Sequence, residues 1–392
     1  MKLQMTVLGW AMLAASAHAT TVRIHYDAGS AALTVAVDQG PGSARRSAIP
    51  KIPKKIHPGA AADPVWTSSW PDALGDLVMQ PQLNGAPSTG GAYRVPAGAT
   101  LDIYPFFGAA HGTVEIAPEI ASPQLGNRRH LRIYYPPSYR ENQAKRYPVL
   151  YMHDGQNLFD AHTASYGVAW EMAATVDQLI AAGTMAEIII VGIDNTPARL
   201  DEYTPCCDPR HGGGKLPAYA AFVADTVKPL IDATLRTLPG RAHTALMGSS
   251  LGGLASFDIV RHRPAQFSMA ASLSGSFWWA GQVMIKDPPG PARASLPLRF
   301  YLDAGTVDDG LAETEAMREA MLAQGYVIGR DLLFYVAPGA RHNEASWAAR
   351  VARPLAWLFP WQQQQQRVVS ALASPAAVKG NGSRQGQAPA SR

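Results

Sequence analysis

The sequence of 392 residues predicts an α/β domain with a mostly parallel sheet, preceded by a smaller antiparallel β-sandwich. Two patterns lead to this prediction. Before about residue 116, apolar and polar residues alternate in short runs separated by Gly, Pro and Asn, which is typical of antiparallel strands. From about residue 129, strand-like apolar runs alternate with helical runs, which is typical of a parallel sheet covered by helices.

The first residues of the chain have the features of an export signal. Lys2 precedes an apolar run from Met5 to Ala15, and Ala17-His18-Ala19 follows. A basic start, a short apolar core and an A-x-A exit are typical of a secretory signal peptide, and the run is too short to span a bilayer. We therefore expect residues 1–19 to be cleaved, which leaves a mature protein that is secreted or periplasmic, without stable membrane insertion.

Residues 20–116 are predicted to form the accessory β-sandwich. Val22 and Ile24 alternate with polar neighbours, and a second alternating run follows a turn. The segment resembles starch-binding-type carbohydrate modules, and in such a module Trp66 and Trp70 would stack on sugar rings. The alternative is that both rings fill the core of the sandwich or contact the next domain.

Residues 117–361 are predicted to form the α/β domain. Strands are expected at residues 131–135, 149–152, 188–193, 244–247, 269–273, 299–303 and 332–336. Helices are expected at residues 168–181, 218–236, 251–261, 311–323 and 346–358. The tail, residues 362–392, starts with a glutamine run and continues in Ser, Ala, Gly and Pro without a period, so we expect it to be disordered.

The charge distribution argues against a nucleic-acid-binding function. The net charge of +4 becomes −1 once Lys2 and the basic residues of the tail are set aside, which are Arg367, Lys379, Arg384 and Arg392. A basic cluster from Arg45 to Lys55 lies in a Pro-rich stretch without interleaved aromatic residues. We interpret this cluster as a solvated loop.

The two cysteines, Cys206 and Cys207, are adjacent. In an oxidising compartment they either form a vicinal disulfide or remain thiols. Their spacing fits neither a metal site nor a C-x-x-C redox motif. The sequence therefore predicts no disulfide framework.

The sequence Gly248-Ser249-Ser250-Leu251-Gly252 reads G-x-S-x-G, the pattern of a nucleophile elbow. A predicted strand precedes it and a predicted helix follows it, which is the context that the pattern needs. Glycines flank such a turn because the backbone is crowded there. Ser250 is therefore the candidate nucleophile, and the alternative is a Gly/Ser-rich turn without a catalytic role.

A serine nucleophile needs a base, and the base needs a carboxylate that orients it. In α/β-hydrolases the three residues occur in the order Ser, acid, His. His342 follows the last predicted strand and is the candidate base. The loop after the preceding strand offers three acids, of which we favour Asp308 over Asp309 and Asp303. Asp309 could instead cap the next helix.

An oxyanion hole needs two backbone amides. One is expected from Leu251, which follows the nucleophile, and the other from the loop after the strand at 149–152. We assign the second to Gln156, with Gly155 as the alternative. His153, at the end of that strand, is interpreted as a structural hydrogen-bonding residue.

Five ordered sequence blocks lie in the α/β region, at residues 148–160, 191–205, 248–253, 305–308 and 339–347. Together they resemble the putative-esterase family, which includes enterochelin-esterase-like hydrolases, feruloyl and acetylxylan esterases, and mycolyltransferases. The resemblance spans about residues 129–358. It implies an α/β-hydrolase fold and ester chemistry, but it does not select a substrate.

The sequence is thus interpreted as that of an exported serine esterase with an accessory domain. Its substrate would be a small-molecule or carbohydrate ester, including a siderophore ester, and its triad needs no metal or organic cofactor. Two alternatives stay open, an acyltransferase with the same triad and a non-catalytic carbohydrate-binding protein. Other residues that could line the site are Arg199, Glu202, Tyr203, Trp278 and Trp279, and each of them could equally serve in internal pairing or packing.

Overall fold

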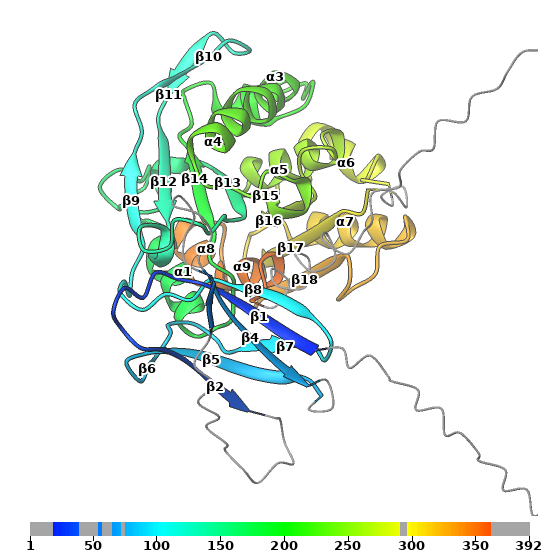
Figure 1. Ribbon diagram of the computed structural model, residues 1–392. Coiled ribbons are helices and arrows are strands. Elements are labelled where there is room, and N and C mark those ends of the chain that lie inside the picture. The colour runs from blue at the N-terminus through cyan, green and yellow to red at the C-terminus, as the bar shows by residue number, and fades with distance from the viewer. Residues whose placement is uncertain (1–18, 39–53, 57–64, 72–74, 291–295, 362–392) are drawn as a thin grey trace, which may run out of the picture.

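The computed structural model describes residues 19–38, 54–56, 65–71, 75–290 and 296–361 (Figure 1). The predicted signal peptide up to residue 18 and the predicted disordered tail, residues 362–392, lie outside the described residues. Most of the basic cluster, residues 45–53, also lies outside them. The described chain forms a small β-unit at its amino-terminal end and a larger α/β unit above it in Figure 1.

The amino-terminal unit consists of two four-stranded sheets that share one core. The strand order is β3-β4-β1-β8 in the first sheet, and the second sheet has the order β2-β5-β6 with β7 also paired to β5. Apolar side chains from both sheets, such as Val22 and Leu101 from the first and Leu33 and Met79 from the second, meet in this core. The strands are β1 (Ala19–His25), β2 (Leu33–Asp38), β3 (Lys54–Ile56), β4 (Val65–Pro71), β5 (Leu77–Leu83), β6 (Ala86–Pro87), β7 (Tyr93–Val95) and β8 (Thr100–Ile103).

Both tryptophans that were considered for sugar stacking belong to this core. The Trp70 side chain is 3% exposed. Trp66 is half-buried, packs on the same core, and donates its indole N–H to the Tyr26 carbonyl at 2.9 Å. The structure therefore favours the core-filling alternative for Trp66 and Trp70.

The α/β unit is built on one eight-stranded sheet with the order β18-β17-β16-β15-β13-β14-β12-β9. The pairs from β18 to β14 are parallel, whereas β12 pairs antiparallel with both β14 and β9. The strands are β9 (Thr113–Ile116), β12 (Leu131–Tyr135), β13 (Val149–His153), β14 (Ile189–Ile193), β15 (Thr244–Ser249), β16 (Met269–Leu273), β17 (Arg299–Gly305) and β18 (Leu332–Ala337). A separate hairpin, β10 (Ile120–Ser122) and β11 (Asn127–Arg129), lies beyond this sheet.

Strand β9 moves the expected domain boundary. Residues 113–116 were predicted to belong to the sandwich, but they form the edge strand of the large sheet. Near them, the Gly112 amide donates to Asp177 at 2.9 Å, and Asp177 belongs to helix α1 (Met172–Ala181). The α/β unit therefore begins before Thr113 and not at Ala117.

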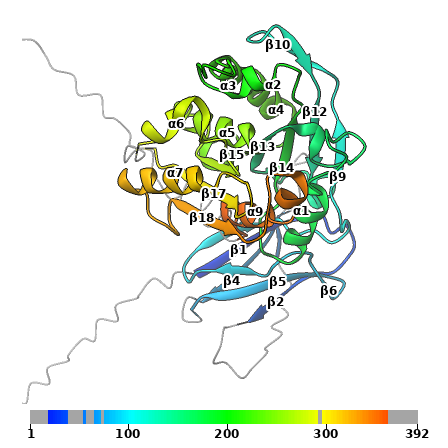
Figure 2. The same cartoon turned by 180° about the vertical axis from the view of Figure 1, so that it is seen from behind.

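Helices cover both faces of the large sheet (Figures 1 and 2). Alternate residues of each strand enter opposite cores, as Tyr151 and Met152 of β13 do. Helices α3 (Leu216–Ala221), η4 (Phe222–Val227), α4 (Lys228–Thr234), α5 (Leu251–His262), α6 (Trp279–Lys286) and α7 (Leu311–Ala323) pack on one face. Helices α1, α8 (Glu344–Ala348) and α9 (Ala352–Leu358) pack on the other.

Two predicted helices are interrupted in the structure. The helix expected at 218–236 consists of α3, the π-helical segment η4 and α4. The helix expected at 346–358 is divided into α8 and α9 by a turn at residues 349–351. Helix α2 (Arg199–Tyr203) and the short 3₁₀ segments η2 (Pro137–Tyr139), η3 (Gly155–Asn157) and η5 (Arg241–His243) were not predicted.

The two units contact each other through polar and aromatic groups. Glu141 of the α/β unit accepts hydrogen bonds from the Tyr26 hydroxyl at 2.9 Å and from the Phe107 amide at 2.8 Å. Trp361 packs near Tyr93, with ring centroids 5.6 Å apart, and donates to the Ala92 carbonyl at 3.2 Å. Through these contacts the sandwich packs on the side of the eight-stranded sheet that carries α1 and α9.

We predict that a truncated chain starting at Ala117 is less stable than one starting at Ala109. Both lack the sandwich, but only the first also loses strand β9 and the bond from Gly112 to Asp177. We expect a lower Tm, by about 2–4 °C for each kcal/mol of stability that β9 and this bond contribute to a domain of this size. Thermal unfolding followed by circular dichroism measures the difference. Equal midpoints would show that β9 adds nothing to the stability of the sheet.

Candidate active site

Ser250 occupies the sharp turn between β15 and α5, at the carboxyl edge of the parallel strands. Its φ of 56° and ψ of −124° lie in a region that L-residues rarely adopt. The Ser250 amide donates to the Leu273 carbonyl at 3.0 Å, and the Ser250 carbonyl accepts from the Leu254 amide at 3.1 Å. Neighbouring elements thus hold the strained backbone that the G-x-S-x-G pattern predicts.

The glycines of the turn are required by space. A Cβ atom on Gly248 would lie 2.7 Å from the carbonyl carbon of Gly252. A Cβ atom on Gly253 would lie 2.4 Å from Ser272 Oγ. Helix α5 can approach strands β15 and β16 this closely only because these positions carry no side chain.

His342 lies on the loop between β18 and α8, and Asp309 and Trp347 position its ring. Its Nδ1 atom is 2.7 Å from Asp309 Oδ1. Trp347 packs edge-on against the imidazole, with ring centroids 5.0 Å apart and an interplanar angle of 85°. Because Nδ1 is bonded to the carboxylate, Nε2 is the nitrogen available to a reacting group.

The carboxylate that contacts His342 is that of Asp309, which corrects the preference for Asp308. The Asp308 side chain is 92% exposed, and its nearest cation is Arg341 at 3.8 Å. Asp308 and Gly310 both have positive φ, of 50° and 67°, so the loop turns sharply and directs only the side chain between them inward. Asp303, the third candidate, is fully buried and forms an ion pair with Arg350 at 3.0 Å.

Asp309 is held as an anion inside the protein. Its Oδ2 atom accepts hydrogen bonds from the Ser274 hydroxyl at 2.7 Å and from the Gly305 amide. Burial acts to raise the pKa of Asp309, but the hydrogen bonds from His342, Ser274 and Gly305 outweigh it and lower the pKa below the usual range of a carboxyl. Asp309 is therefore ionised at neutral pH and can stabilise a protonated imidazole.

Ser250 and His342 line one cavity of about 660 Å³. Its other lining residues are Asp154, Asn157, Ser165, Tyr166, Val168, Asn195, Arg199, Ser249, Asn343, Glu344, Ala345 and Trp347. Among the described residues, the Ser250 hydroxyl forms a hydrogen bond of 3.3 Å with the Ser276 hydroxyl. Catalytic hydrogen bonds are often long or misaligned before substrate binds, so this geometry is compatible with a bond to His342 in a substrate complex.

The residues predicted for an oxyanion hole flank the lining of this cavity. Leu251 is the first residue of α5, where the amides of the first turn have no helical acceptor. Gln156 belongs to η3, and its side-chain Oε1 accepts from the Asn195 amide at 3.1 Å. A Cβ on Gly155 would lie 2.6 Å from the Gly192 carbonyl carbon, so this loop packs directly on β14. The loop that carries the Gln156 amide is thus held against β14 and the residues that follow it.

One wall of the cavity carries a buried ion pair. Arg199 donates to both carboxylate oxygens of Asp154, at 2.7 and 2.8 Å, and Asn195 adds a bond to Asp154 at 2.6 Å. Burial acts to raise the pKa of Asp154, but Arg199 outweighs it and lowers the pKa. Burial raises the pKa of the Glu344 carboxyl on the same wall, and the charge of Asp154 adds to the effect.

Three other residues that the sequence analysis discussed, His153, Glu202 and Tyr203, have structural contacts. His153 is buried and bonded through Nδ1 to the Tyr219 hydroxyl at 2.8 Å, and burial lowers the pKa of His153 to about 4. Its geometry is that of a neutral structural histidine. Glu202 forms an ion pair with the buried Arg129 at 2.9 Å, away from the cavity. Tyr203 accepts a bond from the Asp154 amide at 3.2 Å.

Sequence reasoning missed several residues of the site. Asp154, Ser274, Glu344, Trp347 and Arg350 either line the cavity or contact Asp309. Asp154, Glu344 and Trp347 lie inside the blocks that resemble the esterase family, but the sequence did not indicate what each of them does. Arg350 carried no signal, because its place in the site depends on the interruption between α8 and α9.

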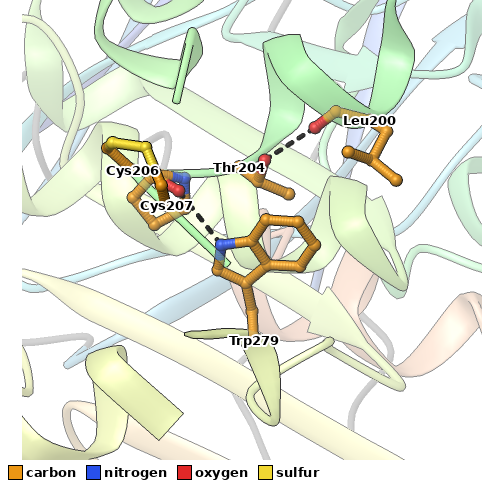
Figure 3. Close-up of a disulfide and its surroundings, with 6 residues drawn as sticks. Leu200, Thr204, Cys206, Cys207 and Trp279 are labelled. Atoms are coloured by element: carbon orange, nitrogen blue, oxygen red, sulfur yellow. Dashed lines mark hydrogen bonds between the residues drawn. A yellow bond between two sulfur atoms is a disulfide. The ribbon is translucent and has the colours of Figure 1, made fainter. Parts of the chain in front are cut away.

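Cys206 and Cys207 form a vicinal disulfide on an exposed loop (Figure 3). The loop follows α2 and is held at its start, where Thr204 donates to the Leu200 carbonyl at 2.7 Å and Trp279 donates to the Pro205 carbonyl at 3.0 Å (Figure 3). Trp279 is thus a buried packing residue, whereas Trp278 is 42% exposed. Neither tryptophan lines the cavity that contains Ser250.

Within the described residues, no cluster of His, Cys, Asp and Glu side chains has the arrangement of a metal site. In the same part of the chain, no helix has the length and apolar character needed to cross a bilayer.

The covered parallel sheet, the elbow at Ser250 and the carboxylate–imidazole pair after the last strands define an α/β-hydrolase. A family model described as "Putative esterase" matches residues 122–358, so the chain belongs to this family of ester hydrolases. An uncharacterised Bacillus subtilis (strain 168) protein, YbbA, is 25% identical over 253 residues, which cover 61% of this chain and 96% of YbbA.

Solved structures share the fold. A ferulic acid esterase superposes with a TM-score of 0.51 at 20% identity and covers 64% of this chain and 98% of its own. The enterobactin esterase FES from Shigella flexneri has a TM-score of 0.50 at 18% identity, covering 83% of this chain and 87% of its own. The second alignment covers a larger share of this chain than the first.

We predict that Gly248→Ala destabilises the protein, whereas Gly290→Ala does not. The added methyl at residue 248 would meet the backbone of Gly252, while a Cβ at residue 290 has no neighbour within 4 Å among the residues that the structure describes. Overpacking of this kind costs about 1–3 kcal/mol. Urea unfolding of both variants gives the difference in free energy. An unchanged midpoint for Gly248→Ala would contradict the close approach of β15 and α5.

Proposed function

We propose that the protein is an exported serine ester hydrolase in which Ser250, His342 and Asp309 form the catalytic triad. The observation that carries this proposal is a buried, ionised Asp309 bonded to the imidazole of His342, which shares one cavity with the strained Ser250. A serine, a carboxylate and an imidazole in this chain order match the requirements of nucleophilic acyl transfer.

In the proposed mechanism, Ser250 Oγ attacks the ester carbonyl while His342 Nε2 removes its proton. The tetrahedral oxyanion accepts hydrogen bonds from the amides of Leu251 and Gln156. Collapse expels the alcohol, which takes the proton from His342 and leaves an acyl-serine. Water then attacks this acyl-enzyme with His342 again as base, releasing the acid and free Ser250. Asp309 stabilises the positive imidazole in both halves of the reaction.

The cavity supports a substrate with an apolar ring and polar substituents. Tyr166 and Val168 stand at its rim, 77% and 40% exposed, and can cover a flat apolar group. The same cavity offers Asn195, Arg199 and Glu344 for hydrogen bonds. Feruloyl and catecholate siderophore esters combine both features and agree with the names of the structural relatives.

A panel of acetyl, feruloyl, longer acyl and siderophore esters tests this substrate class. The proposal expects the highest kcat/KM for the hydroxylated aromatic acyl groups. Product analysis in the presence of an added alcohol or sugar distinguishes hydrolysis from acyl transfer. A protein that turns over no ester would be a non-catalytic binding protein.

We predict that Ser250→Ala, His342→Ala and Asp309→Asn each abolish most turnover, whereas Asp308→Asn has little effect. Removal of a triad serine or histidine lowers kcat by about 10⁶-fold and loss of the carboxylate by about 10⁴-fold in well-studied cases. Asp308 is the matched control because it is adjacent, carries the same charge and points to solvent. Steady-state hydrolysis of an aryl acetate measures all four variants. If Asp308→Asn is the damaging change, the assignment of the acid is wrong.

Export is supported by the leader and by the disulfide. The pattern around Ala17-His18-Ala19 predicts cleavage before Thr20, and Cys206–Cys207 is oxidised, as is typical of proteins outside the reducing cytoplasm. Amino-terminal sequencing of protein collected from the periplasm or medium should begin at Thr20. A chain that still begins at Met1 would contradict the prediction.

A further inference from the structure

The structure places a second buried carboxylate behind the candidate triad. The Asp303 side chain is fully buried at the end of β17 and accepts a bond from the Tyr301 hydroxyl at 2.8 Å. Burial raises the pKa of Asp303, and the charge of Arg350 opposes this effect. Asp303 does not line the cavity, so it cannot contact substrate.

Arg350 bridges this carboxylate and that of Asp309. Its side chain is 5% exposed, with Nε 3.0 Å from Asp303 and Nη2 3.3 Å from Asp309. The same Nη2 donates to Ser274 Oγ at 2.6 Å, and Ser274 in turn donates to Asp309 at 2.7 Å. Nη1 donates to the Ser346 carbonyl at 3.0 Å. The planar guanidinium therefore has a fixed orientation between two acids.

This arrangement links Asp303 to His342 through charge. In a dry environment, the potential of a buried charge is only weakly screened. The positive charge of Arg350 would disfavour a second positive charge on His342, while the negative charge of Asp303 compensates for Arg350. Among the described residues, the other charges near His342 are Asp309, the exposed pair of Arg341 and Asp308, and Glu344, Asp154 and Arg199, which line the same cavity.

We propose that Arg350 and Asp303 are positioning residues for the catalytic base, in which Arg350 fixes Asp309 against His342 and Asp303 neutralises Arg350 so that His342 can still accept a proton. This inference rests on the proposed triad and deepens it. It gives a role to Asp303, a carboxylate of β17 that is buried without contacting His342.

The two partners should change the pH profile in opposite directions. In Asp303→Asn, Arg350 keeps its charge but loses one of its two acids, so protonation of His342 becomes harder. The acid-side midpoint of kcat/KM should move to lower pH by about one unit, with a lower plateau because the base is weaker. In Arg350→Met the positive charge is lost, protonation becomes easier, and the midpoint should move to higher pH.

Two further variants separate charge from shape. Arg350→Lys keeps the charge but cannot bridge both acids as a planar fork, so it should restore the midpoint without restoring the plateau. Arg353→Met is the matched control, because Arg353 is exposed, lies three residues away and stacks on Tyr335. It should change neither midpoint nor plateau.

The experiment measures kcat/KM for an aryl ester as a function of pH for the full-length mature chain and these variants. Circular dichroism at each pH shows that the proteins are folded. Opposite shifts for Asp303→Asn and Arg350→Met support the inference, and if Asp303→Asn does not fold, the comparison of Arg350→Met with Arg350→Lys decides it. Unshifted midpoints, or shifts in the same direction, overturn it.

The same assay keeps this inference separate from the proposed function. Ser250→Ala and Asp309→Asn must be nearly inactive for the triad to stand. If they retain activity, the proposed function fails. If they are inactive while the Arg350 and Asp303 variants keep the parent midpoint, only the role of the buried pair fails.

Discussion

The hydrogen-bond register of the parallel strands β15 to β18 is the constraint on which the site depends. Ser249 pairs with Leu273, Leu273 pairs with Asp303, and Asp303 pairs with Tyr335. The ladder continues one step past the strand ends, where the amides of Ser250 and Ser274 donate to the carbonyls of Leu273 and Asp303. Strands β15 and β16 end at this level, and β17 and β18 run two residues further, to Gly305 and Ala337. The loops therefore leave the same edge of the sheet, which lets short connections bring a serine, an acid and a histidine together.

At this edge of the sheet, the protein keeps several carboxylates out of water. A buried charge is tolerated only when partners compensate the loss of hydration. Asp309 has His342, Ser274 and the Gly305 amide as partners, and Asp154 has Arg199 and Asn195. These networks leave each acid with little freedom to rotate. A carboxylate that cannot rotate gives the attached imidazole a single orientation, which is what repeated proton transfer at one nitrogen requires.

The sequence was informative wherever local pattern determines structure. Apolar periodicity located the strands of the large sheet to within a few residues, and the G-x-S-x-G pattern located Ser250. Sequence patterns failed where the path of a loop determines which side chain points inward. Asp308 and Asp309 have identical side chains, and only a turn with positive φ directs one of them to His342. Sequence patterns also failed at β9 and at the turn between α8 and α9, where pairing across the fold overrides local preference.

The disulfide of Cys206 and Cys207 differs from most disulfides in how it can contribute to the stability of the protein. A crosslink stabilises a protein mainly by restricting its unfolded state, and the effect grows with the length of chain that it closes. A bond between sequence neighbours closes almost no chain, so its loss would leave the unfolded ensemble nearly as free as before. Its contribution is therefore local: it shapes the exposed segment after α2, and cooperative unfolding of the protein should depend little on the redox state of this pair.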